Sequence, residues 1–477
     1  MKMLIGGKWK DASNGATFPV YNPATGELID TVPAATPEDV EEALLCAKAA
    51  QKEWGALPTY KRAEVMLRFA QLVNGQKEDL ARSISREVGK ANPDAMGECN
   101  NAVALFTGFA EKAKHTYEQS YPAGMEAGTE GRMQIVVREP IGVVAAIIPF
   151  NYPLTLFSHK VAPALTAGNA VVVKPASDCP LTLLRIAEIM KEAGLPDGVL
   201  NIITGRGEAV GNSLVDNDII GAVSLTGSTE VGAKIAGMAA KHIVPATLEL
   251  GGNDPFIILG DTDLDMAVSN AVMGRTGNAG QVCSSSKRFL VHNSIKEAFT
   301  EQLIAKLKML KVGDPALPDT QMGCLINAKA AEGVREQVEH IVAQGATLAL
   351  GGKNDGAFFE PTVLTGVTGE MDIAKDMEVF GPVFPVIGFD TDEEAIAIAN
   401  SSQYGLSSSI HSRDIGRALR MSHKLETGNV VINGCGFIRS KEMPYGGHKK
   451  SGIGNEGISI TMEEFTRPKV IILKDIL

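Results

Sequence analysis

The chain is predicted to be an α/β protein with two doubly wound parallel-sheet domains and a small bridging β-sheet. Its 477 residues exceed what a single hydrophobic core normally holds, so more than one domain is expected. Short Val/Ile-rich runs alternate with amphipathic helical stretches, the pattern of βαβ units around a parallel sheet. The apolar runs are continuous, which is typical of strands covered by helices on both faces.

The first half of the chain predicts a helical region followed by one α/β domain. Residues 35–113 are expected to be mostly helical. The stretch 181–193 predicts a helix, because Gly194 and Pro196 follow it and end helices in this arrangement. Apolar runs predict strands at 142–148, 170–173, 199–203 and 221–225.

The second half predicts another α/β domain, with strands at 255–259, 288–291, 347–350, 383–387 and 429–432. Two further runs, 133–138 and 469–473, fit neither series and predict isolated strands. Because a bare strand edge invites aggregation, these strands are expected to be paired. The expected division is 1–117 with 140–251 as the first domain, 252–455 as the second, and 118–139 with 456–477 as bridging segments.

Composition excludes several classes of protein. The net charge of -11 and the pI near 5.4 argue against nucleic-acid and anionic-membrane partners, which would repel the chain. The longest nearly apolar run, 141–150, has ten residues, about half of a membrane span. The six cysteines are scattered without a Cys-x-x-Cys pair, so neither a metal site nor a disulfide framework is expected. The start lacks a secretion signal. These features predict a soluble cytoplasmic protein.

One cysteine and one glutamate carry most of the functional information. Cys283 stands in Gly-Gln-Val-Cys-Ser, 34 positions after Glu249 in Leu-Glu-Leu-Gly-Gly-Asn. A thiol can add to a carbonyl carbon, and a carboxylate can activate the water that releases the product. Either residue alone is ordinary, because a lone cysteine is usually buried packing and a lone glutamate is usually solvated. Together, in these contexts, they resemble the paired signatures of the NAD(P)-dependent aldehyde dehydrogenase superfamily.

The resemblance extends from Asn22-Pro23 to the C-terminal strand and implies an aldehyde dehydrogenase-like fold. It makes the first domain NAD(P)-binding and the second catalytic, with a bridging sheet that pairs subunits into a dimer or tetramer. It implies that the Cys283 thiolate forms a thiohemiacetal and then a thioester, and that Glu249 assists hydrolysis to the acid. Asn151, in Pro-Phe-Asn-Tyr-Pro, would hold the oxyanion with the Cys283 backbone N–H.

Two glycine-rich turns are candidates for phosphate binding. The run 205–211 looks like a dinucleotide fingerprint, but its third glycine comes one position late, and read alone it is a strand-to-helix turn that includes Gly207. The run 225–232 is a better candidate, because an apolar strand leads into a helix that Ser228 can cap. The resemblance assigns Gly227 and Ser228 to the pyrophosphate, and Gly207 is predicted to contact the cofactor as well.

Other residues are predicted to hold the ribose and nicotinamide parts of NAD or NADP. Lys174, at a strand end, can bind the adenosine ribose. Ser177 stands where the family often has a glutamate that repels a 2′-phosphate. NADP should therefore be accepted and is a candidate for the preferred cofactor. The adjacent Asp178 argues in the other direction, because it carries a negative charge. Glu378 matches the family's clamp on the nicotinamide ribose, and Phe380 would pack beside the ring. The cleft is also predicted to include Ile147, Pro149 and Phe150.

The predicted substrate is a small aliphatic aldehyde with a polar or acidic tail. Phe106 and Phe437 are candidates for the wall of an apolar tunnel, and Asn101 and Arg439 for contacts to a hydroxyl or carboxylate. A CoA-acylating semialdehyde dehydrogenase is an alternative, although that branch typically lacks a glutamate at 249. A cofactor-independent cysteine hydrolase or acyltransferase is another; it would need a histidine beside the thiol. A non-enzymatic protein with the same fold is the third.

Overall fold

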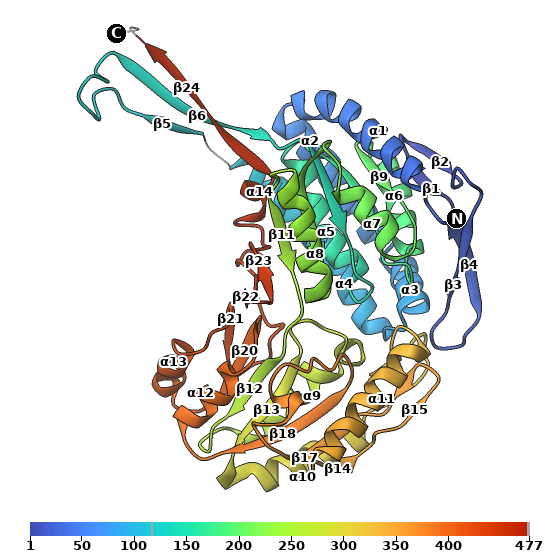
Figure 1. The fold of residues 1–477 in the computed structure, drawn as a ribbon, viewed down its shortest axis with the longest axis vertical. Helices are drawn as coiled ribbons and strands as arrows, with labels where there is room; N and C mark the ends of the chain where they lie inside the picture. Colours follow the sequence, from blue (N-terminus) through green and yellow to red (C-terminus); the bar gives the residue numbers. More distant parts are fainter. Residues whose placement is uncertain (116–117, 475–477) are drawn as a thin grey trace.

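The computed structural model describes residues 1–115 and 118–474 as two α/β units with a projecting arm (Figure 1). The predicted segments also include residues 116–117 and 475–477, which lie outside the described residues. The helical region expected at 35–113 consists of four helices, and the helix expected at 181–193 is α6. The helices of the first unit are α1 (Pro37–Ala56), α2 (Thr59–Gly75), α3 (Lys77–Val88), α4 (Asn92–Lys114), α5 (Pro153–Thr166), α6 (Leu181–Glu192), α7 (Gly207–Val215) and α8 (Thr229–Lys241).

The first unit is built on an eight-stranded sheet whose strands from β9 to β11 run parallel. Along β7, Val144 and Ala146 enter one hydrophobic core, whereas Val143 and Ala145 enter another. Both faces are therefore covered, as the continuous apolar runs predicted. The strand order is β2 (Lys8–Lys10), β1 (Met3–Ile5), β9 (Leu200–Ile202), β8 (Ala170–Lys174), β7 (Val143–Ile147), β10 (Ile220–Thr226), β11 (Ala246–Glu249) and β23 (Gly452–Ile453).

The second unit has a seven-stranded sheet that is parallel except for its edge strand β14. Phe256 and Ile258 enter one core and Ile257 the other, so this sheet is also covered on both faces. Its strand order is β14 (Thr347–Leu350), β17 (Thr362–Val367), β18 (Val383–Phe389), β13 (Ser286–His292), β12 (Asp254–Ile258), β20 (Ser407–His411) and β21 (Asn429–Ile432). Its helices are α9 (Leu264–Thr276), α10 (Lys296–Lys308), α11 (Ala328–Ala343), α12 (Asp392–Asn400) and α13 (Ile415–Ser422).

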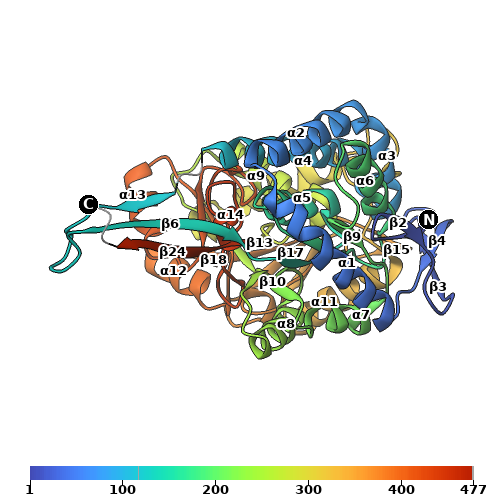
Figure 2. The ribbon, with the colours of Figure 1, turned by 90° about the horizontal axis from the view of Figure 1, so that it is seen from above.

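The arm is a three-stranded antiparallel sheet that extends away from both units (Figures 1 and 2). Its two long strands are the segments expected as isolated strands, and they pair from Thr466 opposite Pro140 to Lys474 opposite Arg132. The edge of the arm exposes large apolar side chains, including Val470 and Ile472. The strands are β5 (Gln119–Tyr121), β6 (Arg132–Pro140) and β24 (Thr466–Lys474).

The chain crosses between the units near its C-terminal end. Strand β23 falls in the range expected to belong to the second domain, but it pairs antiparallel with β11 in the first sheet. Glu456, three residues after β23 and expected in a bridging segment, is buried beside the cleft between the units. None of the described helices is long and apolar enough to cross a membrane.

Candidate active site

The loop that carries Cys283 lies between a short 3-10 turn (Gly277–Gly280) and β13 of the second sheet. Three consecutive residues before it have left-handed backbone angles: Asn278 with φ of 47°, Ala279 with 53° and Gly280 with 78°. A Cβ on Gly280 would lie 2.4 Å from the Gly381 carbonyl oxygen. Such conformations cost about 1–3 kcal/mol each in non-glycine residues and persist only where the surroundings impose them. Cys283 therefore follows a constrained turn that packs against residue 381.

Asn151 reaches this loop from the first unit, between β7 and the start of α5. Its side-chain Nδ2 donates to the Gln281 carbonyl at 3.0 Å, and its own carbonyl accepts from Asn278 Nδ2 at 2.9 Å. The amide keeps a second N–H, which is the donor that an oxyanion would need. The predictions from the sequence did not include Asn278. Asparagine is one of the residues that adopts the left-handed backbone conformation found at this position.

Glu249 ends β11 and is nearly fully buried, with neither carboxylate oxygen hydrogen-bonded among the described residues. The pKa of Glu249 is raised to about 8, mainly by burial and also by the charge of Glu456, whereas Lys160 and the neighbouring Cys283 thiol oppose this shift. A carboxyl group in this range can exchange a proton near neutral pH, which is the requirement for a general base.

A buried ion pair behind Glu249 was missed in the sequence. Lys160 Nζ, on α5, lies 2.5 Å from Glu456 Oε1, and both side chains are almost inaccessible to solvent. Through this pair, helix α5 and the segment around residue 456 both act on the Glu249 carboxylate. Only the fold joins these positions, so no local pattern indicated them.

Several polar groups surround the Cys283 thiol. Burial and the charge of Glu249 raise the pKa of the Cys283 thiol, whereas Lys287, a hydrogen bond from Tyr445 and Arg439 lower it. The Tyr445 hydroxyl lies 3.7 Å from the sulfur. The Arg439 guanidinium stacks 3.5 Å from the centroid of the Tyr445 ring. Arg439 is thus held inside the site.

A cavity of about 390 Å³ opens onto Cys283, within the usual size range of ligand sites. Three of the four predicted substrate residues, Asn101, Phe437 and Arg439, line it together with Cys283 and Asn151. It also contains polar groups that the sequence did not indicate, including Thr155 Oγ1 and His159 Nδ1, which are buried without a hydrogen-bond partner among the described residues. Burial lowers the pKa of His159 to about 4, so that side chain is neutral.

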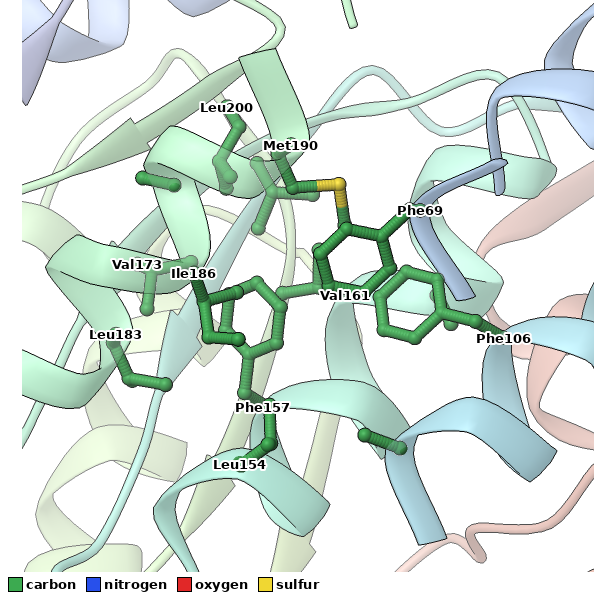
Figure 3. Close-up of a cluster of buried hydrophobic side chains, with 14 of the residues drawn as sticks. Phe69, Phe106, Leu154, Phe157, Val161, Val173, Leu183, Ile186, Met190 and Leu200 are labelled. Atoms are coloured by element: carbon green, nitrogen blue, oxygen red, sulfur yellow. The ribbon is translucent and has the colours of Figure 1, made fainter. Parts of the chain in front are cut away.

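The prediction that Phe106 lines the pocket is wrong. Its side chain is fully buried in the first core, 4.4 Å from the Phe69 ring and 6.4 Å from the Phe157 ring between centroids (Figure 3). Asn101 and Phe106 are five residues apart on α4, which separates them by about 140° around the helix. When Asn101 faces the cavity, Phe106 must face elsewhere.

The predicted adenosine-binding residues lie at the carboxyl ends of adjacent parallel strands. Ile147 at the end of β7 is in register with Lys174 at the end of β8. Lys174 is buried, burial lowers its pKa, and no carboxylate forms an ion pair with it among the described residues. Ser177 Oγ donates to the Gly205 carbonyl at 2.9 Å, which places it against the turn where Gly207 begins α7. Ligands of open α/β sheets bind at this edge.

The predicted phosphate turn follows β10. Ser228 caps α8 by accepting from the Val231 N–H at 3.4 Å, as predicted, and Gly227 precedes it. Thr226 Oγ1, at the end of the strand, is buried without a hydrogen-bond partner among the described residues. The Thr226 hydroxyl and the N-terminus of α8 together offer hydrogen-bond donors that fit a phosphate group.

The predicted nicotinamide-side residues meet across the two units. Half-buried Phe150, which follows Pro149, lies 6.0 Å from Phe380 between ring centroids, edge to face. Glu378 Oε1 accepts from the Gly252 N–H at 3.2 Å. These residues and the adenosine-side groups fit a nicotinamide dinucleotide, which would extend from the first sheet toward Cys283.

Comparison with known proteins agrees with this geometry. The model of the aldehyde dehydrogenase family matches residues 9–471. The chain belongs to this family. It is 39% identical over 473 residues to 3-sulfolactaldehyde dehydrogenase of Pseudomonas putida, covering 98% of this chain and 96% of the relative. It is 38% identical over 473 residues to an NADP(+) succinate-semialdehyde dehydrogenase of Escherichia coli, covering 98% and 97%.

A solved family member has the same fold. Betaine aldehyde dehydrogenase of Staphylococcus aureus in complex with NAD+ superposes with a TM-score of 0.96 at 37% identity, covering 100% of this chain and 95% of that one. The predicted family and fold class are confirmed, and the chain is an aldehyde dehydrogenase. The predicted choice of NADP or NAD agrees with relatives of both kinds.

Proposed function

We propose that this aldehyde dehydrogenase oxidises a small aliphatic aldehyde with a polar or acidic tail to the carboxylic acid, using NADP or NAD. One observation carries the proposal: Cys283 opens into a cavity, and the buried carboxyl group of Glu249 acts on its thiol while neither carboxylate oxygen has a hydrogen bond of ordinary geometry among the described residues. A thiol nucleophile and an adjacent base are what acyl transfer through sulfur requires.

In the proposed mechanism the Cys283 thiol first loses its proton to solvent, and the thiolate then attacks the aldehyde carbon. The oxyanion of the resulting thiohemiacetal is held by the Asn151 side chain and the Cys283 backbone N–H. The nicotinamide cofactor, when bound, supplies the hydride acceptor. Glu249 then takes a proton from water, which hydrolyses the Cys283 thioester to the acid. Because a glutamate is present at position 249, release of the acyl group to water is favoured over its transfer to CoA.

The polar cavity supports the proposed tail. Arg439 and Lys441 line the cavity, and of its three acids Glu98 and Glu456 are each paired with a buried lysine while Asp94 is not, among the residues described. Asn101, Thr155 and His159 offer hydrogen bonds. The relatives named for 3-sulfolactaldehyde, glutarate semialdehyde and succinate semialdehyde are named for aldehydes that also carry an acid group. Val282 stands where phosphate-using relatives often carry arginine, which argues against a phosphorylated aldehyde.

The deciding experiment is a matrix of about ten short aldehydes against NAD and NADP, with initial rates read as NAD(P)H absorbance. We expect semialdehydes and hydroxyaldehydes to exceed unbranched alkanals and aromatic aldehydes in kcat/KM. A wide advantage for long-chain or aromatic aldehydes would contradict the substrate class. Cys283→Ala should abolish turnover while cofactor binding by calorimetry persists, and Cys46→Ala, at a cysteine that is half-buried like Cys283, serves as the matched control.

The same matrix tests the cofactor preference. Ser177 carries no negative charge to repel a 2′-phosphate, so we propose that NADP is accepted and preferred. Ser177→Glu should lower kcat/KM for NADP by at least about tenfold, because one like-charge contact is commonly larger than 1.4 kcal/mol, and should spare NAD. A large wild-type advantage for NAD would refute the preference.

The chain division, assembly and location are also proposals. We propose that the first unit binds the nucleotide and the second carries the catalytic loop. The exposed apolar edge of the arm would then pair with a second copy in a dimer or tetramer. Light scattering should give the mass of an oligomer. A cytoplasmic location, supported by six unpaired cysteines, is tested by fractionation.

A further inference from the structure

Lys287 is a buried cation directly beneath the catalytic loop. It lies on β13, four residues after Cys283, and its side chain is 1% exposed. Its Nζ donates to the carbonyl oxygen of Cys283 and lies 3.3 Å from Glu378 Oε1. One ammonium group therefore contacts both the peptide of the proposed nucleophile and the carboxylate proposed to hold the nicotinamide ribose.

The other buried cations of this region are occupied elsewhere. Arg275 donates to the carbonyls of Val383 and Val379 and to Ser285 Oγ. Arg288 donates to main-chain carbonyls, including that of Asn253. Among these three buried cations, Lys287 is the one that donates to the Cys283 carbonyl and forms an ion pair with Glu378.

We propose that Lys287 is a positioning residue that couples the cofactor carboxylate Glu378 to the Cys283 loop, so that filling one site changes the reactivity of the other. This inference rests on the proposed cofactor role of Glu378. Without cofactor, the Glu378 carboxylate offsets the charge of Lys287. When ribose hydroxyls donate to Glu378, that carboxylate is shared, and more of the Lys287 charge acts on the thiolate. By linkage, a thiolate should in turn favour cofactor binding.

The charges around both groups are consistent with this direction. Cys283 faces Glu249 from β11, Lys287 from β13, and Tyr445 and Arg439 from the C-terminal loop. Lys287 lowers the pKa of the thiol against the larger effects of burial and Glu249. Asp254, another acid near Lys287, has its pKa raised to about 7, mainly by burial and also by Glu378, against the opposing effect of Lys287. Asp254 is therefore a weaker and pH-dependent counter-charge.

The test measures alkylation of Cys283 by iodoacetamide as a function of pH, read on the Cys283 peptide by mass spectrometry. Wild type is compared alone, with NADP, with NAD, and with ADP, which lacks the nicotinamide ribose. We expect NADP or NAD to move the midpoint to lower pH. The larger thiolate fraction should then raise the alkylation rate at pH 7 by at least about fivefold, the lower end of ordinary coupling between sites. ADP should leave the midpoint unchanged.

Variants separate coupling from simple structural support. Lys287→Met should raise the midpoint and remove the shift on cofactor binding, and Lys287→Arg should restore part of it. If Lys287→Met does not fold, Glu378→Gln gives an independent test: the uncompensated lysine should lower the midpoint without cofactor and leave no further shift. Lys308→Met, at an exposed lysine at the end of α10, is the surface control.

The outcomes distinguish this inference from the proposed function. Alkylation needs no turnover, so a cofactor-dependent shift in a protein that fails to oxidise any aldehyde would still support the coupling. Aldehyde oxidation with no shift, or a shift that survives in Lys287→Met, would overturn it. Calorimetric titration of NADP should show weaker binding to Lys287→Met than to wild type by about the same factor as the lost shift.

Discussion

The Tyr445 hydroxyl lies 3.7 Å from the Cys283 sulfur and is almost inaccessible to solvent. Its ring is held in place by the Arg439 guanidinium, 3.5 Å from the ring centroid. The hydroxyl can donate a hydrogen bond to the Cys283 thiolate. This bond stabilises the charged form and lowers the pKa of the Cys283 thiol. A tyrosine 162 positions away in the chain is therefore part of the nucleophile's environment.

Tyr445→Phe should raise the pKa of Cys283. Losing one hydrogen bond of about 0.5–1.5 kcal/mol predicts a fall of about 2- to 13-fold in thiol alkylation at pH 7, with an unchanged rate once the thiol is fully ionised. The measurement is the pH profile of iodoacetamide labelling. Tyr21→Phe, at an exposed tyrosine, is the control. Identical profiles for Tyr445→Phe and wild type would remove the hydroxyl from this role.

Glu249→Gln should stall deacylation. Rapid mixing should show one equivalent of NAD(P)H per site, followed by slow turnover, with the acyl group found on the Cys283 peptide. Because the pKa of Glu249 is raised to about 8, its basic form accumulates as pH rises through that value. The wild-type deacylation rate should therefore rise with pH through about 8, whereas the variant should be flat. Steady turnover at the wild-type rate would contradict the base assignment.

Asn151→Ala should lower kcat by about 10²–10³-fold, the usual cost of one oxyanion donor. The expected signature is a fall in kcat that is larger than any change in KM for cofactor. Asn100→Ala, an exposed asparagine on α4, is the matched control. If kcat is unchanged, the amide has no oxyanion role and serves only its hydrogen bond to Gln281.

Phe106→Ala should reduce the free energy of unfolding by about 3–5 kcal/mol, because it leaves a cavity in a packed aromatic cluster. Its KM for aldehyde should stay near wild type. Phe437→Ala, which lines the cavity, should show the reverse pattern. Denaturant titration and initial rates measure both quantities. A selective rise in KM for Phe106→Ala would restore this residue to the substrate site.

The strands found from the sequence are those with continuous apolar runs, such as β7 and β18. Strand β20 lies inside the second sheet, between β12 and β21, yet its sequence is Ser-Ser-Ser-Ile-His and gives no apolar signal. Its buried hydroxyl of Ser408 is bonded to Thr427 and to the Asn429 carbonyl. Tertiary hydrogen bonds, which single-sequence patterns do not contain, allow this polar strand to be buried.

The site shows the same division. Cys283, Glu249 and Asn151 could be found because each stands in a distinctive local motif. Lys160 and Glu456 could not, because an ordinary lysine and glutamate become significant only when the fold places them 2.5 Å apart in the interior. Phe106 was misplaced for the opposite reason: its residue type suited an apolar wall, but helix geometry directed it into the core.

Glu249 ends a strand of the first sheet, whereas Cys283 precedes a strand of the second. The proposed nucleophile and the proposed base are therefore brought together by the docking of the two units, and neither unit carries both. Slight loosening of that junction would inactivate the enzyme while helix and sheet content remained native. Inactivation by heat or mild denaturant should precede the loss of circular dichroism, and bound dinucleotide, by bridging the halves, should protect against it.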